Sequence, residues 1–187
     1  MRADGRPRLR AIASAISSSL FVGLSLPGCS GGLPRDLQIF PSKEPRAIAR
    51  LVPKDGSVTY GLVTFTQRGD KVALNAVVFA VGQGPHSLYI HETGNCGSPN
   101  AASAGRVWNA AGSANSGKRT GQLPELFGGT DGDATLSAQL RDVSVASGKP
   151  NDVVGHAVVV HDRVNPDPQP EFGARNGWIA CGVIERG

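Results

Sequence analysis

Three cysteines, Cys29, Cys96 and Cys181, are the residues whose chemistry the sequence indicates most directly. In an exported chain, paired cysteines form disulfides, and an odd cysteine needs an explanation of its own. Lipid attachment to Cys29 would supply that explanation. Cys96 and Cys181 then remain as a predicted structural disulfide. Because this bridge would close a long loop, it would stabilise the domain by about 4 to 5 kcal/mol.

The N-terminal segment predicts export and a lipid anchor. A basic stretch over residues 1–10 precedes an apolar run over residues 11–26, which is too short to span a membrane and is typical of a secretory signal. Residues 26–29, Leu-Pro-Gly-Cys, resemble a bacterial lipobox, in which cleavage precedes the cysteine and a lipid is attached to its sulfur. The alternative is a conventional signal peptide with Cys29 unpaired.

These features predict the domain organisation. We expect a lipoprotein signal peptide over residues 1–28, a flexible tether over residues 29–45 that is rich in glycine and proline, and a single domain over residues 46–187. The predicted location is the periplasm or cell envelope, with Cys29 anchoring the chain to a membrane.

Composition and charge narrow the class of protein. The 25 glycines, 13 prolines and 5% aromatic residues favour short strands and many turns, which predicts an all-β domain. The formal charge of +4 includes four arginines and one aspartate from residues 1–10, so that the rest of the chain carries a charge of about +1. The charge therefore gives no reason to expect a nucleic-acid partner.

Alternating apolar residues predict the strands. Residues 58–65 and 72–78 alternate on either side of the turn Arg68-Gly69-Asp70 and are typical of a β-hairpin. Further strands are expected over residues 86–91, 133–145, 153–161 and 178–184. Two long polar loops, residues 92–132 and 162–177, separate them, and loops of that length are usually functional or pinned by another contact.

The order of short motifs resembles the copper/zinc superoxide dismutase family over roughly residues 46–187. Residues 84–92 are similar to the family stretch Gly-x-His-Gly-Phe-His-x-His-Glu, and residues 104–109 to Ala-Gly-x-His-Phe-Asn. Residues 158–161 resemble a Val-Val-His strand end, and residues 179–184 the C-terminal family signature. The resemblance implies a Greek-key β-sandwich, or flattened barrel, of about eight antiparallel strands with two long loops and one disulfide within the domain.

The same resemblance identifies candidate metal ligands. His91 and His161 match two copper ligands of the family, so copper is the ion that they could bind. Three other matched positions have changed. Tyr89 stands where the first copper ligand is expected, Val107 where the bridging histidine is expected, and Trp178 where an arginine draws in the anionic substrate. Arg175 is the nearest possible substitute for that arginine.

The zinc site is predicted to be absent. Residues 92–132 contain no histidine, and the zinc aspartate falls near Gln122.

The resemblance therefore implies a non-catalytic or weakly active dismutase-like lipoprotein that could capture copper. Two alternatives stay open: an active copper-dependent dismutase that converts superoxide with other ligands, and a structural or interaction module of the envelope. The oligomeric state is not indicated.

The remaining histidines have expected roles outside this pair. His86 matches a family histidine taken as structural, holding its strand to a neighbour. His156 lies five residues before His161 and would point to the opposite face of a regular strand. If His91 and His161 bind no metal, they are expected to be satisfied by hydrogen bonds within the sandwich, with Tyr89 and Trp178 filling the space of the lost ions.

Overall fold

The computed structural model describes residues 44–110, 118–164 and 177–187. The predicted signal peptide, Cys29 and nearly all of the predicted tether lie outside these residues, and so does Arg175. None of the described residues forms a helix long and apolar enough to cross a membrane.

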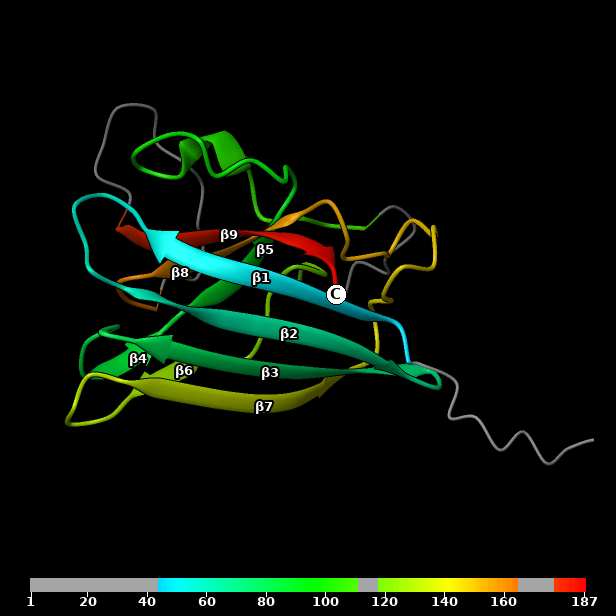
Figure 1. The fold of residues 1–187 in the computed structure, drawn as a ribbon, viewed down its shortest axis with the longest axis horizontal. Coiled ribbons are helices and arrows are strands. Elements are labelled where there is room, and N and C mark those ends of the chain that lie inside the picture. Colours follow the sequence, from blue (N-terminus) through cyan, green and yellow to red (C-terminus); the bar gives the residue numbers. More distant parts are fainter. Residues whose placement is uncertain (1–43, 111–117, 165–176) are drawn as a thin grey trace, which may run out of the picture. The chain divides into compact units, whose positions relative to one another are not determined.

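The described residues confirm the predicted all-β antiparallel fold. Seven strands form one antiparallel sheet in the order β5-β8-β9-β1-β2-β3-β7, and β4 pairs with β6 (Figure 1). Sheet neighbours such as β9 and β1, or β3 and β7, are not consecutive in sequence, which is the arrangement of a Greek key. The elements are β1 (Arg46–Pro53), β2 (Tyr60–Arg68), β3 (Lys71–Phe79), β4 (Gly84–His86), β5 (Leu88–His91), η1 (Ala102–Ala104), β6 (Leu126–Gly128), β7 (Ala134–Leu140), β8 (Ala157–His161) and β9 (Trp178–Arg186).

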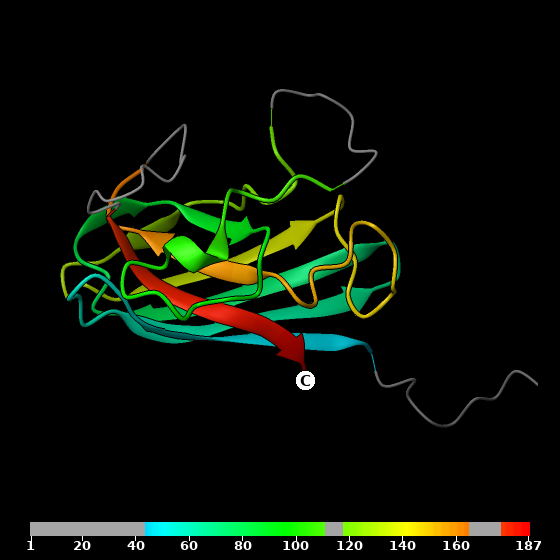
Figure 2. The same cartoon turned by 90° about the horizontal axis from the view of Figure 1, so that it is seen from above.

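The sheet curls around the main hydrophobic core. The views in Figures 1 and 2 place β5 and the β4–β6 pair behind strands β1, β2 and β3, so that the inner faces of these strands enclose the core. Period-two alternation selects the residues that point inward. In β3, Val72, Leu74 and Val78 are buried, whereas Val77 and Phe79 are exposed.

The predicted hairpin is present, and its turn lies within residues 68–70 as expected. Strands β2 and β3 pair over their whole length, from Tyr60 opposite Phe79 to Arg68 opposite Lys71. Gly69 occupies the turn with a positive φ of 60°, a conformation that costs glycine little. The tripeptide at residues 68–70 thus includes the hairpin turn.

Several predicted strand boundaries were wrong. The segment 86–91 is interrupted at Ser87, because β4 pairs with β6 while β5 pairs with β8. The segment 133–145 ends as a strand at Leu140, and the segment 153–161 becomes a strand only at Ala157. Gly155, with a φ of 88°, lies in the turn that delays the second of these. Strand β6 lies within the predicted long loop and was not expected.

The disulfide between Cys96 and Cys181 is present. It joins the loop after β5 to the middle of β9, with a Cα–Cα distance of 5.7 Å that is ordinary for such bridges. Around it lies a second, smaller apolar cluster on the outer face of β8 and β9, beneath η1. Its buried members are Ala101, Ala104, Ala157, Val159, Trp178 and Cys181. The bridge therefore holds a covering loop over this face of the sheet.

Candidate metal centre

The alternation of two neighbouring strands places His91 and His161 together. Strand β5 pairs with β8, and β8 pairs with β9. Residues 88 and 90 of β5 and residues 158 and 160 of β8 belong to the main core. Since successive side chains point to opposite faces, the odd-numbered His91 and His161 lie on the other face, which the loop after β5 covers.

Four aromatic side chains meet on this face. The ring centres of His91 and His161 are 5.8 Å apart. Trp178, at the start of β9, lies 4.6 Å from His91 and 5.3 Å from His161, measured between ring centres. Tyr89 meets His161 edge-on at 4.9 Å. All four are buried, with at most 6% of any of these residues exposed.

The two imidazoles keep nitrogen atoms without hydrogen-bond partners. His91 Nδ1 lies 2.8 Å from the carbonyl oxygen of Gly105, to which an Nδ1–H donates. In that neutral tautomer His91 Nε2 carries a lone pair. His91 Nε2 and both ring nitrogens of His161 are buried, and within the part of the chain described they have no partner. Three polar atoms are therefore buried without a partner on two rings whose centres are 5.8 Å apart.

Burial also keeps both imidazoles neutral. Desolvation lowers the pKa of His91 from 6.5 to about 4, although its hydrogen bond to Gly105 opposes the shift. Desolvation, together with repulsion from His91, lowers the pKa of His161 from 6.5 to about 3. Near neutral pH both rings are thus uncharged, which is the form that binds metals.

Two further residues that the resemblance singles out, Val107 and Gln122, lie beside the pair. Val107 lies directly opposite His91 in an isolated antiparallel bridge and is itself 2% exposed. Gln122 lies opposite Tyr89 in a second bridge, and its Oε1 accepts a hydrogen bond from the backbone of Arg119. An apolar side chain therefore stands next to His91 at the position matched to the bridging histidine.

The other two histidines face backbone carbonyls. His86 Nδ1 lies 3.2 Å from the carbonyl oxygen of His161, and its Nε2 lies 3.2 Å from that of Gly82. His156 Nδ1 lies 2.9 Å from the carbonyl oxygen of Glu92, and the His156 ring stacks at 4.3 Å on Trp108. His156 precedes β8 rather than belonging to it, so the strand argument for its direction does not apply.

Two features of the site were missed from the sequence. The spacing of histidines gave no sign that Trp178 would touch both imidazoles, because that contact depends on the bulge between Val160 and His161. The carbonyl of Gly105, which fixes the tautomer of His91, is a backbone group. Only the position of Trp178 in the family motif pointed toward the site.

The residues present fit copper better than zinc. An ion about 2 Å from one nitrogen of each ring needs ring centres about 6 Å apart when its two bonds are nearly collinear. The separation of 5.8 Å meets that need, and the unpartnered nitrogens supply the lone pairs. Zinc sites require three or four protein ligands. The described ranges contain no group of three or more His, Cys, Asp or Glu residues that could hold a metal.

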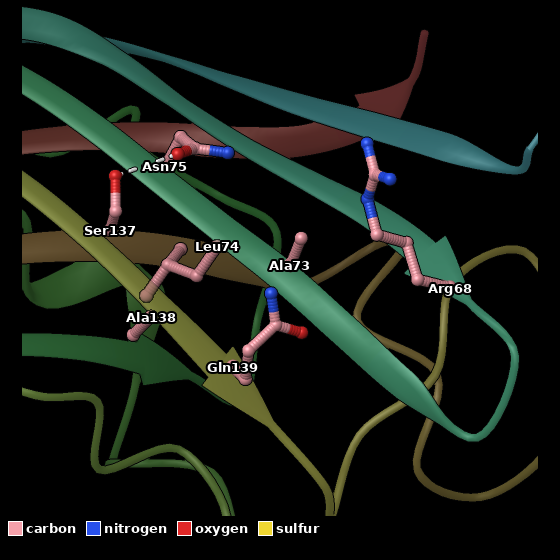
Figure 3. Close-up of a pocket in the computed structure, with 7 residues that line it drawn as sticks. All are labelled: Arg68, Ala73, Leu74, Asn75, Ser137, Ala138 and Gln139. Carbon is pink, nitrogen blue, oxygen red and sulfur yellow. Dashed lines mark hydrogen bonds between the residues drawn. The ribbon is translucent and has the colours of Figure 1, made fainter.

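A shallow groove lies elsewhere, across β2, β3 and β7 (Figure 3). Arg68, Asn75, Ser137 and Gln139 line it around smaller apolar residues, and Ser137 donates a 2.9 Å hydrogen bond to Asn75. None of its lining residues belongs to the histidine pair. The buried histidine pair, rather than this groove, is the candidate for metal chemistry.

Comparison with known proteins supports the sequence resemblance. Residues 59–184 match the family model for copper/zinc superoxide dismutase. The superoxide dismutase [Cu-Zn] of Caulobacter vibrioides is 34% identical over 138 residues, which cover 67% of this chain and 78% of that protein. The corresponding protein of Deinococcus radiodurans is 28% identical over 182 residues, covering 89% of this chain and 93% of the relative.

A solved structure shows the same fold. The clock protein EA4 superposes with a TM-score of 0.62 at 22% sequence identity, covering 78% of this chain and 97% of that one. At this level of identity the likeness concerns the fold alone.

Proposed function

Because this chain belongs to the copper/zinc superoxide dismutase family, we propose that it is an exported, lipid-anchored member that captures copper and has weak dismutase activity or none. His91 and His161 would hold the ion. Zinc has no place in this proposal, because the described residues offer it too few ligands.

The unsatisfied nitrogens of the histidine pair are the observation that carries the proposal. Leaving a buried polar atom without a partner costs about 1 to 3 kcal/mol. His91 and His161 present three such atoms, close together and on neutral rings. A metal ion bound between the rings would use the lone pairs that the protein leaves unpaired. The unpartnered nitrogens destabilise the metal-free fold, and they supply the lone pairs that a metal site needs.

The surroundings of the pair argue against efficient turnover. Copper, when bound, supplies a one-electron redox couple, and its tuning depends on the full ligand set and on access for the substrate. Tyr89, Val107 and Trp178 stand where the family motif has a ligand, a bridging ligand and an attracting arginine. His91 and His161 are at most 2% exposed, so an anion has no open approach to them in this arrangement. The residues hold an ion and shield it.

The predicted anchor and location rest on the N-terminal sequence and on the disulfide. A bridge between Cys96 and Cys181 is typical of proteins in oxidising compartments, which agrees with export. Labelling of cells with a radioactive fatty acid tests the anchor. The wild-type chain should carry the label and partition with membranes, and Cys29→Ser should do neither. An unlabelled wild-type chain would contradict the anchor without bearing on the metal site.

Metal content after loading tests the proposed function. The purified protein, in a Cys29→Ser background that removes the soft free thiol, is loaded with copper and zinc, dialysed and analysed by mass spectrometry. One retained copper is expected, and His91→Ala or His161→Ala should abolish it. His156→Ala is the matched control and should retain it.

The same samples separate the rival functions. Retained copper together with rapid dismutation of superoxide would favour an active copper-dependent dismutase. No retained copper in the wild-type chain would overturn the proposal and favour a structural or interaction module.

A further inference from the structure

Trp178 is placed to act on the metal site rather than only to fill space. It is the first residue of β9, is 1% exposed, and contacts the rings of both His91 and His161. The other tryptophan of the sequence, Trp108, is also buried but stacks on His156, away from the pair. Only Trp178 therefore stands beside the proposed ion.

The three ring centres define where an ion would lie relative to the indole. They form a triangle with sides of 4.6, 5.3 and 5.8 Å. By the median theorem, the indole centre lies about 4 Å from the midpoint between the two imidazoles, inside the roughly 6 Å range of cation–π attraction. A cation held between His91 and His161 would meet the π system of Trp178 at contact distance.

The charge of the site decides which cation it favours. The desolvation penalty of an ion rises with the square of its charge, so a divalent ion pays about four times the penalty of a monovalent ion of similar size. Among the residues that the structure describes, the contacts found for the pair are two neutral imidazoles, a tyrosine, an indole and a backbone carbonyl, with no carboxylate among them. Cu(II) also prefers a tetragonal set of nitrogen and oxygen ligands, whereas soft monovalent ions accept two.

We propose that His91, His161 and Trp178 form a closed site for a soft monovalent ion, Cu(I), in which the indole stabilises the ion by a cation–π contact. This inference rests on the proposed function, because it specifies the ion that the same histidines take. It assigns Trp178 a selecting role. The indole adds neither a negative charge nor a lone pair that would offset the larger desolvation penalty of Cu(II) or Zn(II), so the site favours Cu(I). It also occupies the position at which the family motif has the arginine that attracts superoxide.

Silver(I), a redox-inert ion of the same charge and softness, tests the proposal without any activity assay. Two proteins are compared, both carrying Cys29→Ser: Trp108→Phe, in which Trp178 is the only tryptophan, and Trp178→Phe, in which Trp108 is. Native mass spectrometry counts bound silver while tryptophan fluorescence is recorded. Heavy-atom quenching requires contact, so one silver ion should quench Trp178 by more than half and leave Trp108 unchanged.

Affinity supplies the second measurement. A desolvated cation–π contact is worth about 2 kcal/mol, so Trp178→Leu should weaken silver binding roughly 10- to 30-fold, and Trp178→Phe should weaken it less. Zn(II) should not compete with silver at equal concentration. Near-ultraviolet circular dichroism confirms that each variant is folded.

Two results would overturn the inference in different ways. If one silver ion binds through the histidines while Trp178 fluorescence stays constant and Trp178→Leu binds equally well, the cation–π contact is refuted and copper capture survives. If neither silver nor copper binds, the proposed function fails, and the role of Trp178 fails with it.

Discussion

Two regions on the same face of β8 and β9 join distant parts of the chain in different ways. At one, Cys96 and Cys181 form a covalent bridge that leaves no reactive group behind. At the other, His91 and His161 face each other at 5.8 Å with three nitrogen atoms unsatisfied. The first region is chemically complete within the chain, whereas the second leaves one lone pair on each ring free for an added ion.

This comparison indicates that the residues that stabilise the fold are different from the residues that could bind a metal. The bridge, the strand order and the core need none of the metal ligands. Tyr89 and Val107 can therefore stand where the resemblance places ligands, and Trp178 where it places an arginine, without loss of the sheet. In the second region Tyr89, Val107 and Trp178 lie around the two imidazoles, and burial lowers the pKa of each imidazole. The substitutions therefore change what the pair can bind while the scaffold persists.

The largest loss of stability is expected when the disulfide between Cys96 and Cys181 is removed. Replacing both cysteines, Cys96→Ala with Cys181→Ala, should lower the free energy of unfolding by about 4.5 kcal/mol, because the bridge closes a loop of 85 residues in the unfolded chain. Urea denaturation measures this loss. A loss below about 1 kcal/mol would show that the covering loop is held without the bridge.

The next largest change in stability is expected when the pH is lowered, and it comes from His91 and His161. Both histidines have a lower pKa in the fold than their ordinary value of 6.5, so below that pH the unfolded chain binds more protons than the folded one. The metal-free protein should lose on the order of 4 kcal/mol between pH 7 and pH 5 through this pair, about 2 kcal/mol for each histidine.

The double variant His91→Leu with His161→Leu isolates that contribution, since all carboxylates remain. Its stability should fall less over the same range of pH than that of the wild-type protein. If the stability of the two proteins fell in parallel as the pH was lowered, the prediction would be contradicted. The histidines would then be hydrated or hydrogen-bonded in solution.

A smaller effect distinguishes satisfied from unsatisfied histidines. His86→Leu removes a ring whose two nitrogens lie 3.2 Å from the carbonyl oxygens of His161 and Gly82, and a neutral imidazole donates to one of them, so the variant should cost about 1 to 3 kcal/mol. His161→Leu removes two buried ring nitrogens that have no partner, so it should leave the stability of the metal-free protein unchanged or raise it by up to about 2 kcal/mol. Thermal unfolding in a chelator compares the two, and equal costs would contradict the contrast.

The smallest effect tests the histidine that lies outside the pair. His156→Ala removes a stack on Trp108 and a contact with the carbonyl of Glu92, and should cost about 1 kcal/mol. Copper retention should not change. If this variant lost copper, the binding site would extend beyond the two histidines.

Much of the fold could be predicted because its determinants are local. Alternation and a glycine turn are sufficient for the β2–β3 hairpin, and the two cysteines left after Cys29 indicate the bridge. The boundaries failed where the partner strand decides the outcome. Residues 86–91 contain no glycine or proline, yet the chain changes partners at Ser87, from β6 to β8. The three residues of β6 form a strand only because β4 is available to them.

The candidate site was predictable only in part. Motif order identified His91 and His161, and strand pairing explains their approach. The depth of burial, the role of the Gly105 carbonyl and the place of Trp178 beside both rings depend on a bulge and on a covering loop. Sequence spacing carries no information on either feature.

X-ray absorption spectroscopy of the copper-loaded protein tests the central claim most directly, because it counts the atoms bound to the ion. In the Cys29→Ser background we expect Cu(I) with a first shell of two nitrogen atoms and the multiple scattering of two imidazoles, and no second metal nearby. A shell of three or more strong ligands, a shell without imidazole, or a protein that retains no copper would contradict the account of a surviving pair of histidine ligands.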